Sequence, residues 1–173
     1  MKRLVLFIFE IIVGLSIFIS TLERPMVEVV AEELPVEEKC FGFYLTDSEL
    51  DRIYLVMVGE ALSEGNKGML KVASVVYNRL YTGGFYGETL EDVLRPSQFS
   101  ILLFYTYDEL EKFDKVNMPD FQRDYLKDEI RSIFCLGSPI THANHYHTVD
   151  IKPYWADPNT VVSQYQNHIF YYF

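Results

Sequence analysis

Two glutamates in the segment 59–65 have the spacing of a catalytic or ligand-binding pair. Glu60 and Glu64 are four residues apart, and side chains at positions i and i+4 of a helix project from the same face. Glu60 lies in an apolar run, so partial desolvation would keep its carboxyl group protonated at a higher pH. A general acid at a glycosidic bond needs such a proton near neutral pH. The spacing alone is more typical of a solvated helix face, so it needs support from other signals.

The four histidines all fall in the last third of the domain: His142, His145, His147 and His168. His145 and His147 would share one face of a strand. Three histidines with a carboxylate could form a zinc site. Because the segment has neither a cysteine ligand nor a helical HxxxH pair, we favour histidines that line a groove or pack in the core. We therefore expect no metal and no cofactor.

Aromatic residues offer a second kind of contact near these histidines. Tyr146, Tyr154 and Trp155 could stack on the apolar faces of sugar rings. The chain has 27 aromatic residues, however, so most of them must belong to the core. Gly83-Gly84 follows a predicted helix and not a strand, which argues against a phosphate-binding loop. No serine has the context of a nucleophile elbow.

Two helices are predicted to position the glutamates. Thr46 and Glu49 have capping-box spacing and begin a helix over residues 47–64. A second helix over residues 66–81 ends at Gly83-Gly84. The residues expected to point inward are Leu50, Ile53, Tyr54, Met57 and Ala61 in the first helix and Met69, Val72, Ala73, Val76 and Leu80 in the second.

The rest of the domain changes from helical to extended patterns. Thr89 is placed to cap a short turn, and a long helix is predicted over residues 119–136. Its inner face should hold Phe121, Tyr125, Ile130 and Phe134. From about residue 141 the sequence is rich in aromatic and β-branched residues, which is typical of strands. We therefore expect a mainly helical α+β fold with a small β part near the C-terminus.

The N-terminal segments differ from the domain in composition. Residues 1–22 begin with basic residues and continue as an apolar run, the pattern of a signal peptide or a membrane anchor. Glu10 inside this run would cost roughly 2–3 kcal/mol at mid-membrane, so both interpretations stay open. Residues 23–45 are predicted to be an acidic tether, and residues 46–173 the folded domain. We expect the protein to be exported or membrane-anchored.

The net charge bears on which partners the protein can bind, and the two cysteines bear on whether it contains a disulfide. The 15 basic and 25 acidic side chains give a formal charge of −10, and residues 41–173 carry −7 of it. Such an acidic chain repels the phosphates of a nucleic acid backbone, so we expect no nucleic acid partner. Separately, we expect the protein to be a monomer. Because 49% of the residues are apolar, the chain can form a core. In an exported protein, Cys40 and Cys135 could form a disulfide or remain two separate thiols.

Five sequence blocks, taken in order, give a resemblance to a known family. They are GEALSEG, GMLKVASVVYNRL, PSQFS, HANHYHT with PYWA, and NHIFYYF, and they extend from about Leu50 to Phe173. Together they resemble the cell wall hydrolase family typified by bacterial spore cortex-lytic enzymes, which also has phage members. Five ordered blocks are more specific than any single one, so the resemblance strengthens the glutamate hypothesis.

The resemblance implies a compact, lysozyme-like fold that acts on the glycan strands of peptidoglycan. It implies that Glu60 is the catalytic acid and that Glu64 positions the substrate or tunes Glu60. Members resemble lytic transglycosylases, in which one carboxyl group protonates the bond between N-acetylmuramic acid and N-acetylglucosamine. The same group then activates the 6-hydroxyl of the sugar, which closes a 1,6-anhydro ring. Simple hydrolysis of that bond stays open.

The same sequence blocks also supply the residues predicted to line a substrate groove. Two alternative hypotheses for the function remain. The loop after the acid departs from the family pattern, with Leu62-Ser63 in place of Arg-Gly and Met69 in place of Gln. One alternative is a zinc-dependent amidase or peptidase that uses the histidines. The other is a non-catalytic peptidoglycan-binding protein with an inert glutamate. Besides Glu64, the residues expected to bind substrate are Gln98, His145, Tyr146, His147 and Trp155.

Overall fold

The computed structural model describes residue 40 and residues 42–173. The predicted signal or anchor segment, residues 1–22, and most of the acidic tether lie outside the described residues. Within the described part, no helix is both long enough and apolar enough to cross a membrane. The helices are α2 (Asp47–Ala61), α3 (Gly65–Thr82), α4 (Leu90–Val93), α5 (Ile101–Phe104), α6 (Tyr107–Asn117) and α7 (Asp120–Leu136). The strands are β1 (His145–Thr148), β2 (Val161–Tyr165) and β3 (His168–Tyr171).

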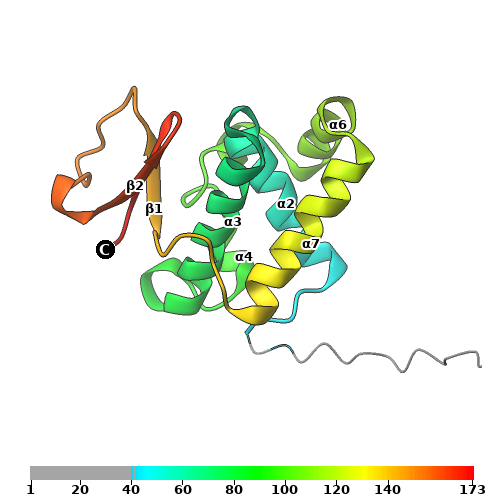
Figure 1. Cartoon of the computed structure of the whole chain (residues 1–173), viewed down its shortest axis with the longest axis horizontal. Helices are drawn as coiled ribbons and strands as arrows, with labels where there is room; N and C mark the ends of the chain where they lie inside the picture. Colours follow the sequence, from blue (N-terminus) through cyan, green and yellow to red (C-terminus); the bar gives the residue numbers. More distant parts are fainter. Residues whose placement is uncertain (1–39, 41) are drawn as a thin grey trace, which may run out of the picture. The chain divides into compact units, whose positions relative to one another are not determined.

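A small antiparallel sheet lies on one side of the helices, with α3 between the sheet and the pair α2 and α7 (Figure 1). The strand order is β1-β3-β2, so the last strand is central. Tyr146 of β1 pairs with Phe170 of β3. Val75 of α3 and Phe170 belong to one buried cluster between the helix and the sheet. The prediction of a mainly helical α+β fold with a β part near the C-terminus is confirmed.

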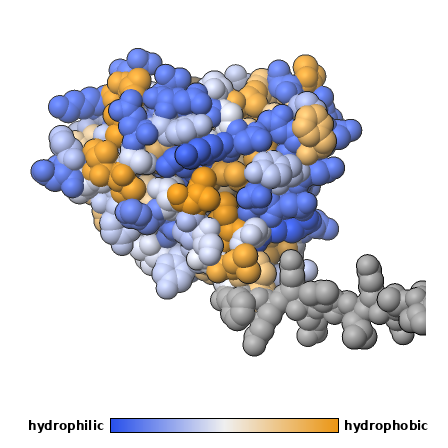
Figure 2. All heavy atoms as spheres, viewed as in Figure 1, coloured by the Kyte–Doolittle hydropathy of each residue, from blue (hydrophilic) through white to orange (hydrophobic). Residues whose placement is uncertain are grey.

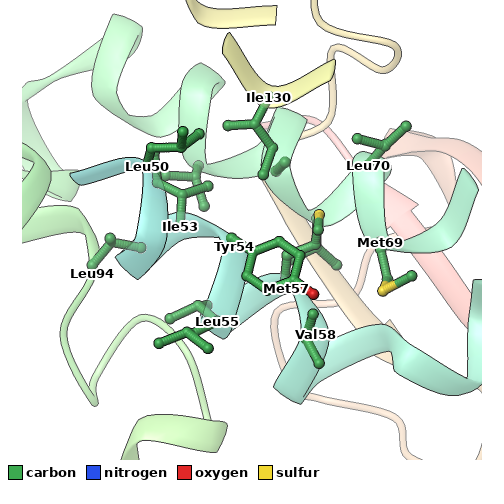
Figure 3. Packing of buried hydrophobic residues seen from close by; sticks show 14 of the residues in the cluster. Leu50, Ile53, Tyr54, Leu55, Met57, Val58, Met69, Leu70, Leu94 and Ile130 are labelled. Atoms are coloured by element: carbon green, nitrogen blue, oxygen red, sulfur yellow. The ribbon is translucent and has the colours of Figure 1, made fainter. Parts of the chain in front are cut away.

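The core forms where α2, α3 and α7 meet (Figure 3). The predicted inward residues of α2 are all buried, and so are four of the five predicted for α3, whereas Leu80 is partly buried. The predicted capping box at Thr46 begins α2, and Thr89 caps α4 as predicted, there as part of a second capping box with Asp92.

Helix α7 packs with a different face from the predicted one. Phe121 is 77% exposed and Tyr125 47% exposed, whereas Leu126, Ile130 and Phe134 are buried. At about 100° per residue, position 121 lies roughly 180° around the helix from position 130. The prediction for Phe121 and Tyr125 was therefore wrong, because those two aromatic residues do not share the periodic face of the other two.

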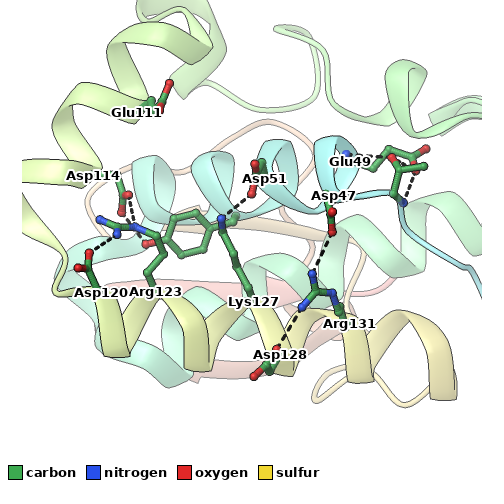
Figure 4. A network of polar contacts seen from close by, with 12 residues as sticks. Asp47, Glu49, Asp51, Glu111, Asp114, Asp120, Arg123, Lys127, Asp128 and Arg131 are labelled. Atoms are coloured by element: carbon green, nitrogen blue, oxygen red, sulfur yellow. Dashed lines mark hydrogen bonds and ion pairs between the residues drawn. The ribbon is translucent and has the colours of Figure 1, made fainter. Parts of the chain in front are cut away.

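Ion pairs and hydrogen bonds tie α7 to α2 and α6 (Figure 4). Asp114 of α6 is buried and accepts hydrogen bonds from the Tyr54 hydroxyl at 2.5 Å and from Arg123 Nε at 2.7 Å. Lys127 of α7 pairs with Asp51 of α2 at 2.5 Å. These contacts hold α6 beside α2, where α5 and α6 pack against the C-terminal end of α2 that carries Glu60.

The surface of the domain seen in Figure 2 is mainly hydrophilic and has scattered apolar patches.

Helix α2 ends three residues earlier than predicted. Ala61 leaves helical geometry at φ −142°, and Leu62–Glu64 form a short 3-10 turn before α3. Glu60 and Glu64 are therefore not on one helix, and the i, i+4 argument for a shared face does not hold.

The two cysteines lie near one another at the far end of α7. The Gly42 N–H donates to the Cys135 carbonyl at 2.8 Å, and Cys40 and Cys135 line one pocket. Disulfide pairing between them stays a prediction.

Candidate functional site

Glu60 lies in the last turn of α2, where the helix emerges from the core, and its side chain is partly buried. The Ile101 N–H donates to Glu60 Oε1 at 2.8 Å, and the Ser100 hydroxyl donates to the same oxygen at 3.2 Å. Both donors come from the start of α5, about forty residues along the chain. The fold therefore brings two donors to this carboxylate.

Tyr146 of β1 contributes a third donor. Its hydroxyl is hydrogen-bonded to Glu60, and its pKa lies well above the ordinary value because of burial first and the Glu60 charge second. The phenol is therefore protonated at neutral pH and donates to the carboxylate. The Tyr146 ring packs against His168 and Phe170, with centroids 5.3 and 5.7 Å away. The structure thus places the predicted sugar-stacking residue in contact with Glu60.

Arg79 of α3 is a buried cation behind the carboxylate. Its Nε donates to the Asn144 carbonyl at 2.7 Å, and its Nη1 donates to the Gln98 carbonyl at 2.9 Å. Burial lowers the pKa of Arg79, and the neighbouring Tyr146, Tyr86 and Glu60 oppose that shift through their charges. Neither this arginine nor Ser100 was predicted as a residue of the site. The PSQFS block contains Ser100, but its spacing does not show which carboxylate it meets.

Gln98 and His145 lie on the Arg79 side of the carboxylate. The Gln98 side chain donates to the Tyr86 carbonyl at 3.5 Å, at the limit of a hydrogen bond. His145 Nδ1 lies 3.0 Å from Asn144 Oδ1 and 3.4 Å from the Tyr86 hydroxyl. Burial, and then the Arg79 charge, lower the pKa of His145 to about 4. His145 is therefore neutral near pH 7.

His147 and Trp155 belong to an aromatic cluster on the same face of β1 as His145. The Trp155 ring lies 5.1 Å from the His145 ring and 5.6 Å from the His147 ring, centroid to centroid. His147 is buried, and its ring nitrogens lie 2.8 Å from the Tyr171 hydroxyl and from the Thr148 carbonyl. His145 and His147 share a face as predicted. Among the described residues, no group of three or more His, Cys, Asp or Glu is arranged to hold a metal ion.

Glu64 contacts the β2–β3 turn. It is 1% exposed, and its carboxylate accepts hydrogen bonds from the backbone N–H and the side-chain amide of Asn167, both at 3.1 Å. His168 Nδ1 lies 3.5 Å away, and the Gln166 side chain donates to the Glu64 carbonyl at 3.0 Å. The position of this carboxylate indicates that it anchors the hairpin. A role in substrate positioning stays a prediction.

A largely apolar groove of about 310 Å³ lies beside Glu60, and we call it the α5–α6 groove. A methyl group on Gly59 would lie 2.6 Å from Ile101 Cγ1 and 3.1 Å from Leu110 Cδ2. Glycine at this position therefore allows α2 to pack closely against these two side chains. The residues that line the groove are Gly59, Ile101, Tyr105, Glu109, Leu110 and Phe113.

This arrangement is suited to proton transfer. A partly buried carboxyl group in the last turn of α2 receives three hydrogen-bond donors and has a buried cation nearby, and the adjacent Gly59 and the donor Ile101 line a groove. Donors aimed at a carboxylate stabilise the charge that appears when the group gives up its proton. The site therefore holds a carboxyl group in a fixed position from which it can exchange a proton with a bound molecule.

The fold and this site define an α+β domain with a carboxylate-centred candidate active site. A family model described as Cell Wall Hydrolase matches residues 63–171, and the chain belongs to this family. The resemblance found in the sequence is thus confirmed, and the substrate that the family implies is peptidoglycan. The matched segment contains Glu64 and all the predicted groove residues and begins three residues after Glu60. No curated protein and no solved structure matches the chain.

Proposed function

We propose that this cell wall hydrolase cleaves the glycosidic bond between N-acetylmuramic acid and N-acetylglucosamine as a lytic transglycosylase, with Glu60 as acid and then base. The observation that carries the proposal is the environment of the Glu60 carboxylate. Ile101 and Tyr146 donate to it from two sides, and the α5–α6 groove lies beside it. Such a site can hold a reacting carboxyl group next to a bound sugar.

In the first step, the Glu60 carboxyl group gives its proton to the glycosidic oxygen while the bond from that oxygen to C1 of N-acetylmuramic acid breaks. The sugar that retains the oxygen leaves with a 4-hydroxyl group, and positive charge develops at C1. The Glu60 carboxylate forms as its proton departs. The donors from Ser100, Ile101 and Tyr146 and the nearby Arg79 charge favour that anion.

In the second step, the carboxylate takes the proton of the 6-hydroxyl group of the same N-acetylmuramic acid, and O6 bonds to C1. The 1,6-anhydro ring closes, and Glu60 is again protonated. The reacting hydroxyl belongs to the sugar, so its high effective concentration replaces a bound water. One carboxylate is sufficient for both steps, which agrees with Glu64 being occupied by Asn167.

The test is the variant Glu60→Gln, measured by lysis of purified sacculi. We expect the fold and the binding of sacculi to persist while the rate of lysis falls by at least about a thousandfold, because glutamine has no acidic proton to donate. Glu111→Gln, on the exposed side of α6, is the matched control and should retain activity. Full activity of Glu60→Gln would show that another group is the acid.

Mass spectrometry of the released fragments decides between the bond-breaking chemistries. Transglycosylation leaves 1,6-anhydro-muramic ends, and these are the expected products. Reducing ends would mean simple hydrolysis by the same carboxyl group. Released stem peptides with intact glycan strands would instead mean an amidase, and binding to sacculi with no fragments at all would mean a non-catalytic protein.

A further inference from the structure

The α5–α6 groove has no role in the two proton transfers, yet it adjoins the reacting carboxylate. Ile101 joins the two features directly, because its N–H donates to Glu60 and its side chain lines the groove. Any group held in the groove is therefore next to the acid. At about 310 Å³, the groove is at the lower end of the range of small-molecule sites, roughly 300–1,000 Å³.

The segment 98–101 extends from the groove to a second set of site residues. Gln98 at its start contacts Tyr86 and Arg79, which adjoin His145. Ser100 and Ile101 at its end contact Glu60. The carboxylate therefore lies between two contact regions. An acid that cleaves a bond between two sugars needs this arrangement, with one sugar on each side.

The lining of the groove indicates which sugar it fits. Tyr105 and Phe113 are 51% and 44% exposed, so their rings are available for the apolar face of a pyranose. Glu109 is the one charged group of the six lining residues, and hydrogen bonds from Thr106 lower its pKa, so it is negative at neutral pH. That charge disfavours an anionic ligand such as a sugar that carries a lactyl group and an acidic stem peptide.

We propose that the α5–α6 groove binds the neutral N-acetylglucosamine residue that leaves when the bond breaks. The inference rests on the proposed function, because it takes the bond and the direction of cleavage from it. N-acetylmuramic acid, with its lactyl group and peptide, then lies on the side of His145 and Gln98. The groove thus sets which of the two alternating bonds of the glycan strand is placed at Glu60.

The test measures binding of N-acetylglucosamine tetramer, a peptide-free and uncharged glycan, by titration calorimetry in the Glu60→Gln background. We expect Tyr105→Ala and Phe113→Ala each to weaken binding by roughly tenfold, the value of one lost aromatic contact. The matched controls are Phe104→Ala and Val116→Ala, which remove apolar side chains that are more exposed and do not line the groove. They should bind as the parent does.

The outcomes separate this inference from the proposed function. If the tetramer binds and only the groove variants weaken it, the groove is shown to bind N-acetylglucosamine. If Glu60→Gln also shows that the acid is a different group, the groove remains a binding site for that sugar, but its assignment to the leaving side is overturned. If the groove variants weaken binding of peptide-bearing muropeptides and leave tetramer binding unchanged, the groove is a peptide site and the inference is overturned. Equal losses in groove and control variants, or no binding of the tetramer by the parent, would overturn it as well.

Discussion

The contact between Tyr146 and Glu60 joins two elements that lie far apart in the sequence. Glu60 ends the first helix, whereas Tyr146 lies on the first strand, more than eighty residues later. A hydrogen bond to a charged carboxylate contributes roughly 1.5–3 kcal/mol, more than a neutral one. Tyr146 therefore acts as a positioning residue, because it orients the carboxylate and favours its charged form.

Removal of the Tyr146 hydroxyl should change catalysis more than folding. In Tyr146→Phe we expect kcat to fall roughly ten- to hundredfold with little change in KM, because the ring contacts remain and one donor is lost. A loss of thermal stability with an unchanged kcat would mean that the hydroxyl is merely structural. Tyr165→Phe, in the β2–β3 hairpin, is the control.

At the scale of elements, the early end of α2 decides what each glutamate does. Because the helix stops at Ala61, Glu60 remains at the groove while the 3-10 turn directs Glu64 towards Asn167. Gly68 follows one turn later, and a methyl group there would lie 2.1 Å from Glu64 Cβ. The start of α3 is therefore packed closely around a buried carboxylate that links helices to sheet.

Truncation of Glu64 should destabilise the domain and leave the acid intact. In Glu64→Ala we expect a loss of about 2–3 kcal/mol in the free energy of unfolding, because the two Asn167 donors lose a charged acceptor. Activity measured well below the melting temperature should persist. Ser63→Ala, exposed on the same turn, is the control and should change neither quantity by much. An unchanged melting temperature with abolished activity would instead support the predicted role in substrate positioning.

Local sequence signals predicted elements better than contacts between them. The capping box at Thr46 was predicted from its spacing, and Thr89 was predicted to cap a short turn. The same box spacing at Thr106 and Glu109 was not recognised, so α6 was missed. The end of α2 could not be found, because Leu62 and Ser63 do not break a helix by type. Tertiary packing chose the turn there.

In the candidate site, too, single residues were easier to predict from the sequence than the contacts between them. Glu60 was proposed as the acid from the family resemblance, whereas the residues that contact it depend on how distant parts of the chain pack together. Ser100, Ile101 and Tyr146 reach Glu60 from forty and more than eighty residues away, and a backbone N–H has no sequence signature. The burial of Arg79 could not be predicted, because it depends on Asn144, the residue before β1, lying against α3.

In the domain as a whole, the exposed carboxyl groups and the partly buried His145 affect the stability of the folded state in different pH ranges. Several exposed carboxyl groups have pKa values below their ordinary range because of nearby donors or cations, so their contributions disappear only in strong acid. His145 differs because its pKa of about 4 lies below the ordinary 6.5. The unfolded chain therefore binds a proton between pH 6.5 and 4 that the folded domain does not.

The stability of the domain should consequently fall as pH decreases through that window. A depressed histidine pKa contributes stability that is fully present above pH 6.5 and is lost as the pH falls towards about 4. In His145→Phe, which keeps an aromatic ring beside Trp155, the melting temperature should fall less between pH 6.5 and 4 than in the parent. His142→Gln, at an exposed histidine, should keep the parent slope. Calorimetric scans across the window measure both slopes, and an equal slope in His145→Phe and the parent would show that His145 is not buried as a neutral ring.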